Sequence, residues 1–275
     1  MNPAFNIQGS EGNPLSTELL LLIGFQQVDF VTISNEKQVN RLVSFNMPAD
    51  SMAENIKGYL EEIISNQPVL QNGYKKINVI YNFPASVIVP HEFFNESAGK
   101  EMLELVFGFV DGNLIKTDFI YQHNLHNFYT VPVLLHTYLA EVFPAATFTH
   151  LYSVLPETIG FDNNHLYCIF GSNDVTLMLL KNKQLQIMQQ FIYKTPEDVV
   201  YHLLNVCSNF SADTDDTIVH LNGMLDENSN LYKELYKYFS ILQFETLSEK
   251  FTYPAELKNY PEHYFSHLFG IASCV

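Results

Sequence analysis

One pattern of apolar and polar positions occurs twice along the chain, in residues 19–64 and in residues 166–210. In the first copy, the continuous apolar run Leu19–Ile23 is typical of a strand that is buried on both faces. Turn residues separate this run from two further strands, and the three together predict an antiparallel meander. The expected strands cover residues 19–23, 28–34 and 39–45.

A helix and a fourth strand complete the first copy. Apolar residues spaced by three or four positions predict one buried helix face, and Asp50 or Ser51 is suited to cap its start. That face is expected to consist of Met52, Ile56, Tyr59, Leu60, Ile63 and Ile64. The strand that follows is expected at residues 77–81.

The second copy repeats this order, with strands expected at residues 167–170, 175–180, 186–193 and 218–221. Pro196 stands in the first turn of the intervening helix, where its missing N–H does no harm. Further strands are expected at residues 87–89, 117–122, 129–131 and 147–149, and further helices at 98–107, 133–142, 231–238 and 261–272. Because duplicated units usually stack or pair, the repeat predicts two similar α/β halves that are intimately joined.

The amino-acid composition of the chain limits the classes of partner that we expect it to bind. A chain of 275 residues with 47% hydrophobic and 16% charged residues can bury a sizeable core, so we expect a folded protein. The net charge of −16 argues against nucleic acid and against anionic membrane surfaces, which both attract clustered lysine and arginine. Solubility is the ordinary explanation of such a charge, and a basic protein partner is the alternative.

The chain shows no sign of export. Residues 1–18 lack the basic start and long apolar core of a secretory signal, and we expect residues 1–17 to form a flexible arm. The apolar run at residues 19–25 is shorter than the roughly 20 residues that span a membrane. Cysteines are few, and a reduced, cytoplasmic setting is expected. They are Cys168 and Cys207, both expected to be buried, and Cys274.

Short motifs of catalysis or metal binding are weak. His123 and His126 flank a polar turn, and His263 and His267 share a helix face, but a metal site needs three or four ligands. No metal site is therefore expected. The acids Asp213, Asp215 and Asp216 lack the spacing of a calcium loop, and a solvated loop is expected instead.

The repeat resembles the actin-like ATPase superfamily, and most closely a family of uncharacterised bacterial proteins within it. The resemblance rests on the sequence segments Tyr129–Pro132, Phe143–Ala146 and Phe265–Ala272, and on His150. The resemblance implies a duplicated ribonuclease-H-like α/β fold, with two lobes that each hold a mixed sheet flanked by helices. The lobes are then expected at residues 18–160 and 161–275.

The resemblance also implies where a nucleotide would bind. In the superfamily, the turn after the first strand of each half cradles phosphates, and an Asp before its Gly holds the metal or positions water. Ile23 and Phe170 stand where those acids are expected. If nucleotide binding is retained, the implied residues are Gly24, Gln26, Gln27, Gly171, Ser172, Asn173, Asn222 and Gly223.

The functional hypothesis depends on Ile23 and Phe170, which stand where the resemblance implies acids. Mg²⁺ requires oxygen ligands, and phosphoryl transfer without it loses its main charge stabiliser. Asp29 and Asp174 lie nearby in the sequence but at a different spacing. We therefore expect no catalytic residues and no cofactor, and a scaffold or adaptor that binds a protein partner. The alternative is a nucleotide-binding switch that takes ATP with Mg²⁺ and hydrolyses it little or not at all. Oligomeric state is left open.

Overall fold

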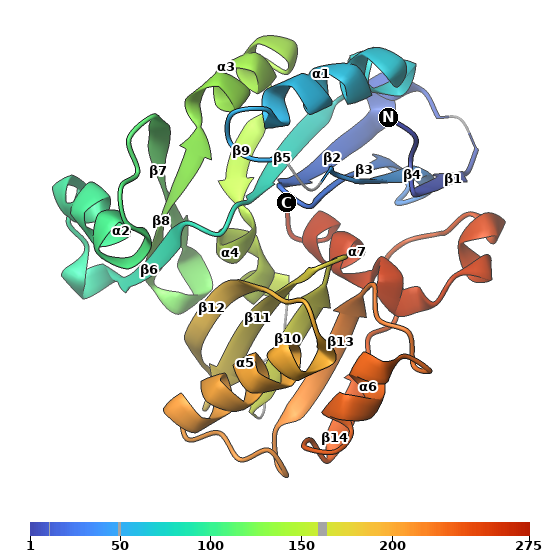
Figure 1. Ribbon diagram of the computed structural model, residues 1–275. Coiled ribbons are helices and arrows are strands. Elements are labelled where there is room, and N and C mark those ends of the chain that lie inside the picture. The colour runs from blue at the N-terminus through green and yellow to red at the C-terminus, as the bar shows by residue number, and fades with distance from the viewer. Residues whose placement is uncertain (11, 49–50, 159–163) are drawn as a thin grey trace. The chain divides into compact units, whose positions relative to one another are not determined.

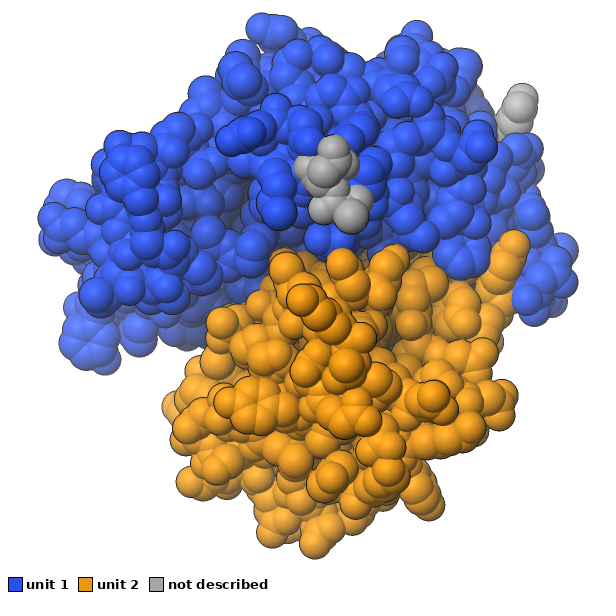
Figure 2. Space-filling view, viewed as in Figure 1, with its two compact units in different colours: residues 1–157, 249–259, 274–275 blue, residues 158–248, 260–273 orange. Residues whose placement is uncertain are grey.

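The computed structural model describes residues 1–10, 12–48, 51–158 and 164–275. Two compact units make up the chain, and Figure 2 colours them separately. Unit 1 contains residues 1–157, 249–259 and 274–275, and unit 2 contains residues 158–248 and 260–273. The lobe boundary expected between residues 160 and 161 lies outside the described residues.

A sheet of six strands forms the centre of unit 1, in the order β1-β4-β3-β2-β5-β9. The strands β2, β3 and β4 form the expected antiparallel meander, and β5 and β9 add to it in parallel to β2. Their bounds are β1 (Phe5–Gln8), β2 (Thr17–Gly24), β3 (Gln27–Ser34), β4 (Val39–Asn46), β5 (Lys76–Asn82) and β9 (Thr147–His150).

Two terminal segments differ from the expected lobes. The expectation of a flexible arm is wrong for Phe5–Gln8, because β1 pairs antiparallel with the edge of β4 and Ile7 is fully buried. Edge strands leave a row of unpaired backbone groups, which this pairing satisfies. Residues 249–259 belong to unit 1, where the N–H of Val39 donates to the carbonyl oxygen of Thr252 at 2.9 Å.

Two helices, α1 (Ile56–Asn66) and α3 (Val133–Val142), cover one face of this sheet (Figure 1). Their buried residues include Leu60 and Leu135, which pack into one core with the side chains of β2, β3 and β5. The helix expected from Met52 starts later, because Met52 is 59% exposed and a turn at residues 53–55 precedes Ile56. The possible cap Asp50 lies outside the described residues.

Between β5 and α3 the chain forms a small insertion with its own sheet, in the order β6-β8-β7. Val89, Leu103, Val110 and Phe128 make its separate core. Its elements are β6 (Ser86–Pro90), α2 (Gly99–Phe107), β7 (Asn113–Ile120) and β8 (Leu125–Pro132). The short helix α4 (Leu151–Val154) follows β9.

Unit 2 holds a sheet of five strands in the order β12-β11-β10-β13-β14. Its strands are β10 (His165–Phe170), β11 (Asp174–Lys181), β12 (Gln184–Ile192), β13 (Ile218–Gly223) and β14 (Ile241–Phe244). Its helices are α5 (Pro196–Asn209), α6 (Asn230–Leu235) and α7 (Ser266–Ala272). The long last helix expected from residue 261 is shorter, because a separate 3₁₀ turn, Glu262–Tyr264, precedes α7.

The two sheets have the same topology. Apart from β1, the order β4-β3-β2-β5-β9 matches β12-β11-β10-β13-β14, with α1 and α5 at equivalent places in the chain. Even the register agrees, since Ile23 faces Val28 in one sheet and Phe170 faces Val175 in the other. Cys168 and Cys207 are buried as expected. Within the described residues, every helix is too short or too polar to cross a membrane.

Candidate functional site

The first turn of the repeat joins β2 to β3 in unit 1. Ile23 is fully buried in the core beneath α1. Gly24 approaches β5 so closely that a Cβ on it would lie 3.0 Å from the carbonyl oxygen of Asn82. Parallel pairing of β2 with β5 brings the two backbones together here, so a glycine is favoured for packing alone.

A hydrogen-bonded polar cluster follows that turn. Nε2 of Gln27 donates to both carboxyl oxygens of Asp29, at 2.9 and 3.0 Å, and lies 3.1 Å from Oγ of Ser44. Burial raises the pKa of Asp29 to about 6, although the hydrogen bonds from Gln27 and Ser44 oppose this rise. The pKa of this carboxyl therefore lies above the ordinary range of an aspartate.

The second turn joins β10 to β11 in unit 2. Phe170 is buried before it, and the N–H of Gly171 donates to the carbonyl oxygen of Asp174 at 2.8 Å. Oδ1 of Asp174 lies only 2.1 Å from where a Cβ on Gly171 would be, so the carboxyl occupies the space beside this glycine. The N–H of Tyr193 donates to the carbonyl oxygen of Asn173 at 2.9 Å and holds the turn to the end of β12.

Asp174 has a carboxamide partner, as Asp29 does. Nε2 of Gln190 donates to its Oδ2 at 2.5 Å, and burial raises the pKa of Asp174 to about 6. In the shared register Asp174 takes the position of Gln27, and Gln190 takes that of Ser44. Each unit thus holds one buried carboxyl–carboxamide pair beside its turn. The acid of the pair occupies non-equivalent positions of the two sheets.

The structure brings the end of β13 beside the second turn. Gly223 pairs with Phe170 and has a φ of +79°, and a Cβ on it would lie 2.2 Å from the carbonyl oxygen of Phe170. Asn222 is engaged within unit 2, because its Nδ2 donates to the oxygen of Cys168 at 3.4 Å and its Oδ1 accepts from Ser266 at 2.8 Å. Ser172 and Asn173 lie in the turn itself. The unit 2 residues expected for nucleotide binding therefore lie together, with Asn222 committed to other contacts.

A row of hydrogen-bonded polar side chains in unit 2 was not predicted from the sequence. Nδ1 of His165 lies 2.8 Å from Nε2 of His220, and Nδ1 of His220 lies 2.5 Å from Oε1 of Glu245. The ring of Tyr167 stacks on His220 with centroids 4.1 Å apart. The signal was available in principle for His165, Tyr167 and His220, because these side chains stand on one face of the neighbouring strands β10 and β13.

The expected absence of a metal site stays a prediction. Among the residues that the structure describes, no three His, Cys, Asp or Glu side chains converge on one point. His126 stacks instead on His91, with nitrogens 2.8 Å apart, and His263 bonds to the oxygen of Leu225 at 2.7 Å. Burial lowers the pKa of His267 to about 4, so this side chain is neutral at pH 7.

The family model described as Protein of unknown function (DUF3822) matches residues 7–242. The chain belongs to this family. No curated protein matches the chain. The expected membership of an uncharacterised family is thereby confirmed.

Comparison with solved structures shows which proteins this DUF3822 chain resembles in fold. A Bacteroides thetaiotaomicron protein with actin-like ATPase fold and unknown function superposes with a TM-score of 0.74 at 17% identity, covering 84% of this chain and 91% of that one. A chain of the PilM-PilN type IV pilus biogenesis complex superposes with a TM-score of 0.61 at 12% identity, covering 95% and 98%. The expected duplicated α/β, actin-like fold is therefore confirmed.

Proposed function

We propose that this DUF3822 chain is a non-catalytic protein of actin-like fold that serves as a scaffold or adaptor for a protein partner. The first support is the chemistry of the two turns. Ile23 and Phe170, where the superfamily carries metal-binding or water-positioning acids, are apolar and buried in the cores of their units. Mg²⁺ takes oxygen ligands, which neither side chain supplies.

The second support is the space around Gly171. The carboxyl of Asp174 fills the position beside this glycine, and an ionised carboxylate there would repel a phosphate oxygen. Asn222, at the adjacent strand end, uses both the nitrogen and the oxygen of its side-chain amide within unit 2. The residues present therefore do not fit a magnesium–nucleotide group, and we derive no catalytic step through one.

The observation that carries the scaffold proposal is an exposed apolar surface on the insertion, which we call the α2 surface. It consists of Leu105, Val106, Phe107 and Phe109, of which Leu105 is 87% and Phe109 is 82% exposed. These residues are close together in the sequence, and a group of apolar side chains exposed to this degree is typical of an interaction site, since their contact with water is unfavourable.

Charge indicates what kind of partner fits the α2 surface. Glu101 and Glu104 lie on the same helix, Asp111 follows it, and the whole chain carries a net charge of −16. Lys100 is the nearby cation, and it is already paired with Asp111 at 2.7 Å. A partner segment that combines apolar with basic side chains would complement both features. The PilM-PilN complex shows that a chain of similar fold takes part in a protein complex.

Site-specific photo-crosslinking in living cells that express this protein tests the proposal. We expect a photoreactive residue at Leu105 or Phe109 to cross-link one predominant protein, and Leu105→Glu to abolish binding of that protein once it is purified. Tyr201, an aromatic residue of α5 that is 65% exposed, supplies the matched control position. Cross-links that are no more specific at Leu105 than at Tyr201 would contradict the proposal.

A further inference from the structure

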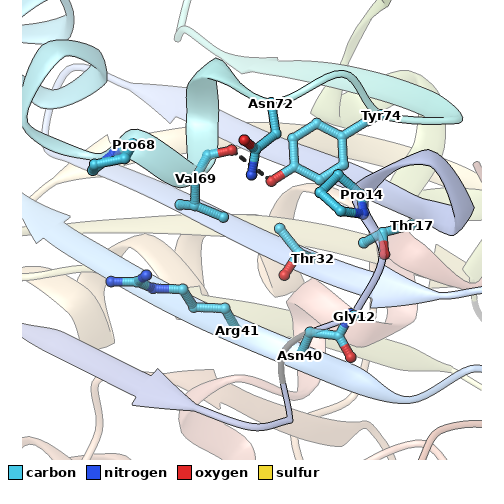
Figure 3. A pocket seen from close by; sticks show the side chains of 10 residues that line it. All are labelled: Gly12, Pro14, Thr17, Thr32, Asn40, Arg41, Pro68, Val69, Asn72 and Tyr74. Carbon is cyan, nitrogen blue, oxygen red and sulfur yellow. Dashed lines mark hydrogen bonds between the residues drawn. The ribbon is translucent and has the colours of Figure 1, made fainter.

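A cavity of about 420 Å³ lies in unit 1, where the loop before β2 and the segment after α1 meet β2, β3 and β4. Six of its lining side chains are polar: Thr17, Thr32, Asn40, Arg41, Asn72 and Tyr74. Figure 3 shows Arg41 and Asn40 on one side, with Asn72 and Tyr74 across from them. Its volume falls within the range of about 300–1,000 Å³ that is usual for small-molecule sites.

Arg41 is the one arginine in the sequence, and it is the one charged residue among the described residues that line the cavity. Its Nη2 donates to Oδ1 of Asn6 at 3.2 Å and to Oε1 of Gln67 at 3.4 Å, both neutral acceptors. Its Nε is buried, and within the described part of the chain it meets no acceptor. No carboxylate of the described residues forms an ion pair with it.

This arrangement leaves one positive charge without a counter-charge. A partly buried guanidinium is costly to keep unless an anion neutralises it and accepts its remaining N–H bonds. Tyr74 does not become that anion, because burial raises its pKa to about 12 and its hydroxyl donates to the oxygen of Val69 at 2.7 Å. The described residues around the cavity therefore supply no anion for Arg41.

We propose that the Arg41 cavity binds a small organic monocarboxylate. One guanidinium balances one negative charge, and its planar fork matches a carboxylate, whereas a phosphate dianion would need further cations. Thr32 and Asn72 offer neutral hydrogen-bonding groups around the head group, whereas Oγ1 of Thr17 already donates to the carbonyl oxygen of Asn13 at 2.9 Å. Pro14 and Val69, with the ring of Tyr74, offer an apolar wall for the rest of the molecule.

Calorimetric titration of the full chain with acetate, propionate, benzoate and phenylacetate tests the proposal, with benzamide as the uncharged match to benzoate. We expect saturable binding of at least one carboxylate, no binding of benzamide, and loss of binding in Arg41→Gln. Lys116→Gln, which removes a cation of β7 outside the cavity, is expected to bind as the unchanged protein does. Failure of all four carboxylates to bind, or equal binding by Arg41→Gln, would overturn the proposal.

A second measurement does not depend on how the variant folds. Phenylglyoxal reacts preferentially with arginine, and Arg41 is the one arginine of this chain, so the modified peptide that contains Arg41 reports on this residue. We expect a carboxylate that binds in the titration to slow this modification several-fold, and benzamide to leave its rate unchanged. An unchanged rate with a saturating carboxylate would place that ligand elsewhere and overturn the assignment to this cavity.

Discussion

Asp29 and Asp174 are the acidic residues that follow the two turns of the repeat. Both are buried carboxyls beside the turns, and burial raises the pKa of each to about 6. Each is held by the side-chain amide of a glutamine, Gln27 in one unit and Gln190 in the other. Each acid binds its proton more tightly in the folded chain than in the unfolded chain. Protonation at low pH therefore stabilises the folded state.

Replacement of Asp174 by Asn is expected to change the pH dependence of stability. The folded pKa of about 6 lies above the ordinary 3.8, so the stability that Asp174 contributes below pH 4 is lost as pH rises through 6. That loss is at most about 3 kcal/mol, and Asp174→Asn should avoid it. Thermal unfolding from pH 4 to pH 8 is the measurement, with exposed Asp216→Asn as control. An unchanged pH slope in Asp174→Asn would contradict the account.

The sequence predicts part of this residue chemistry. Gly24 and Gly171 are recognisable as turn glycines, and the structure places both at turns where a side chain would be crowded. The partners Ser44 and Gln190 could not be predicted, because they come from a neighbouring strand and the sequence does not specify the register. Arg41 was missed for the same reason, since its cavity joins segments that are distant in the chain.

At the scale of elements, the strands follow the apolar pattern and the helix starts depend on local capping. Strand β2 was expected at residues 19–23 and is found at Thr17–Gly24. The start of α1 was expected near Met52 and lies at Ile56, because Oδ1 of Asn55 accepts from the N–H of Met52 and stabilises a turn instead. Periodicity therefore locates a buried face well, while competing side-chain bonds decide where a helix begins.

The start of α5 is closed by a capping box. Oγ1 of Thr195 accepts from the N–H of Asp198 at 3.3 Å, and Oδ2 of Asp198 accepts from the N–H of Thr195 at 3.0 Å. We expect Thr195→Ala to lower the free energy of unfolding by about 1 kcal/mol, and Thr195→Ser to restore most of it. Urea unfolding of the two variants measures this difference. Equal stability of Thr195→Ala and the unchanged protein would show that the cap does not contribute.

The duplication predicts matched effects in the two cores. Leu60 of α1 and Leu203 of α5 are both fully buried against their own sheets. Truncation of either to Ala is expected to lower the free energy of unfolding by about 2–5 kcal/mol, through lost apolar burial and the cavity left behind. Urea unfolding measures each variant, and Leu105→Ala at an exposed position is the control. A loss below about 1 kcal/mol at either core leucine would contradict the equivalence.

At the scale of the whole molecule, the chain has the actin-like fold, and Ile23 and Phe170 stand where the resemblance implies acids. The sequence alone predicts this fold, because the same order of strands and helices is repeated at full length. It does not predict the α2 surface, since exposure of Leu105 and Phe109 depends on how the insertion packs. The sequence therefore leads to the fold and the family, and the exposed surface leads to the proposed scaffold role.

The rate of phosphate release from ATP in the presence of Mg²⁺ tests the central proposal most directly. With Ile23 and Phe170 in place of the metal-binding acids, we expect the purified chain to release no phosphate above the buffer alone. ATP, ADP and GTP are likewise expected to leave its melting temperature unchanged, whereas a nucleotide-binding switch would be stabilised by one of them. Steady hydrolysis by the unchanged protein that Gly171→Ala abolishes would contradict the account.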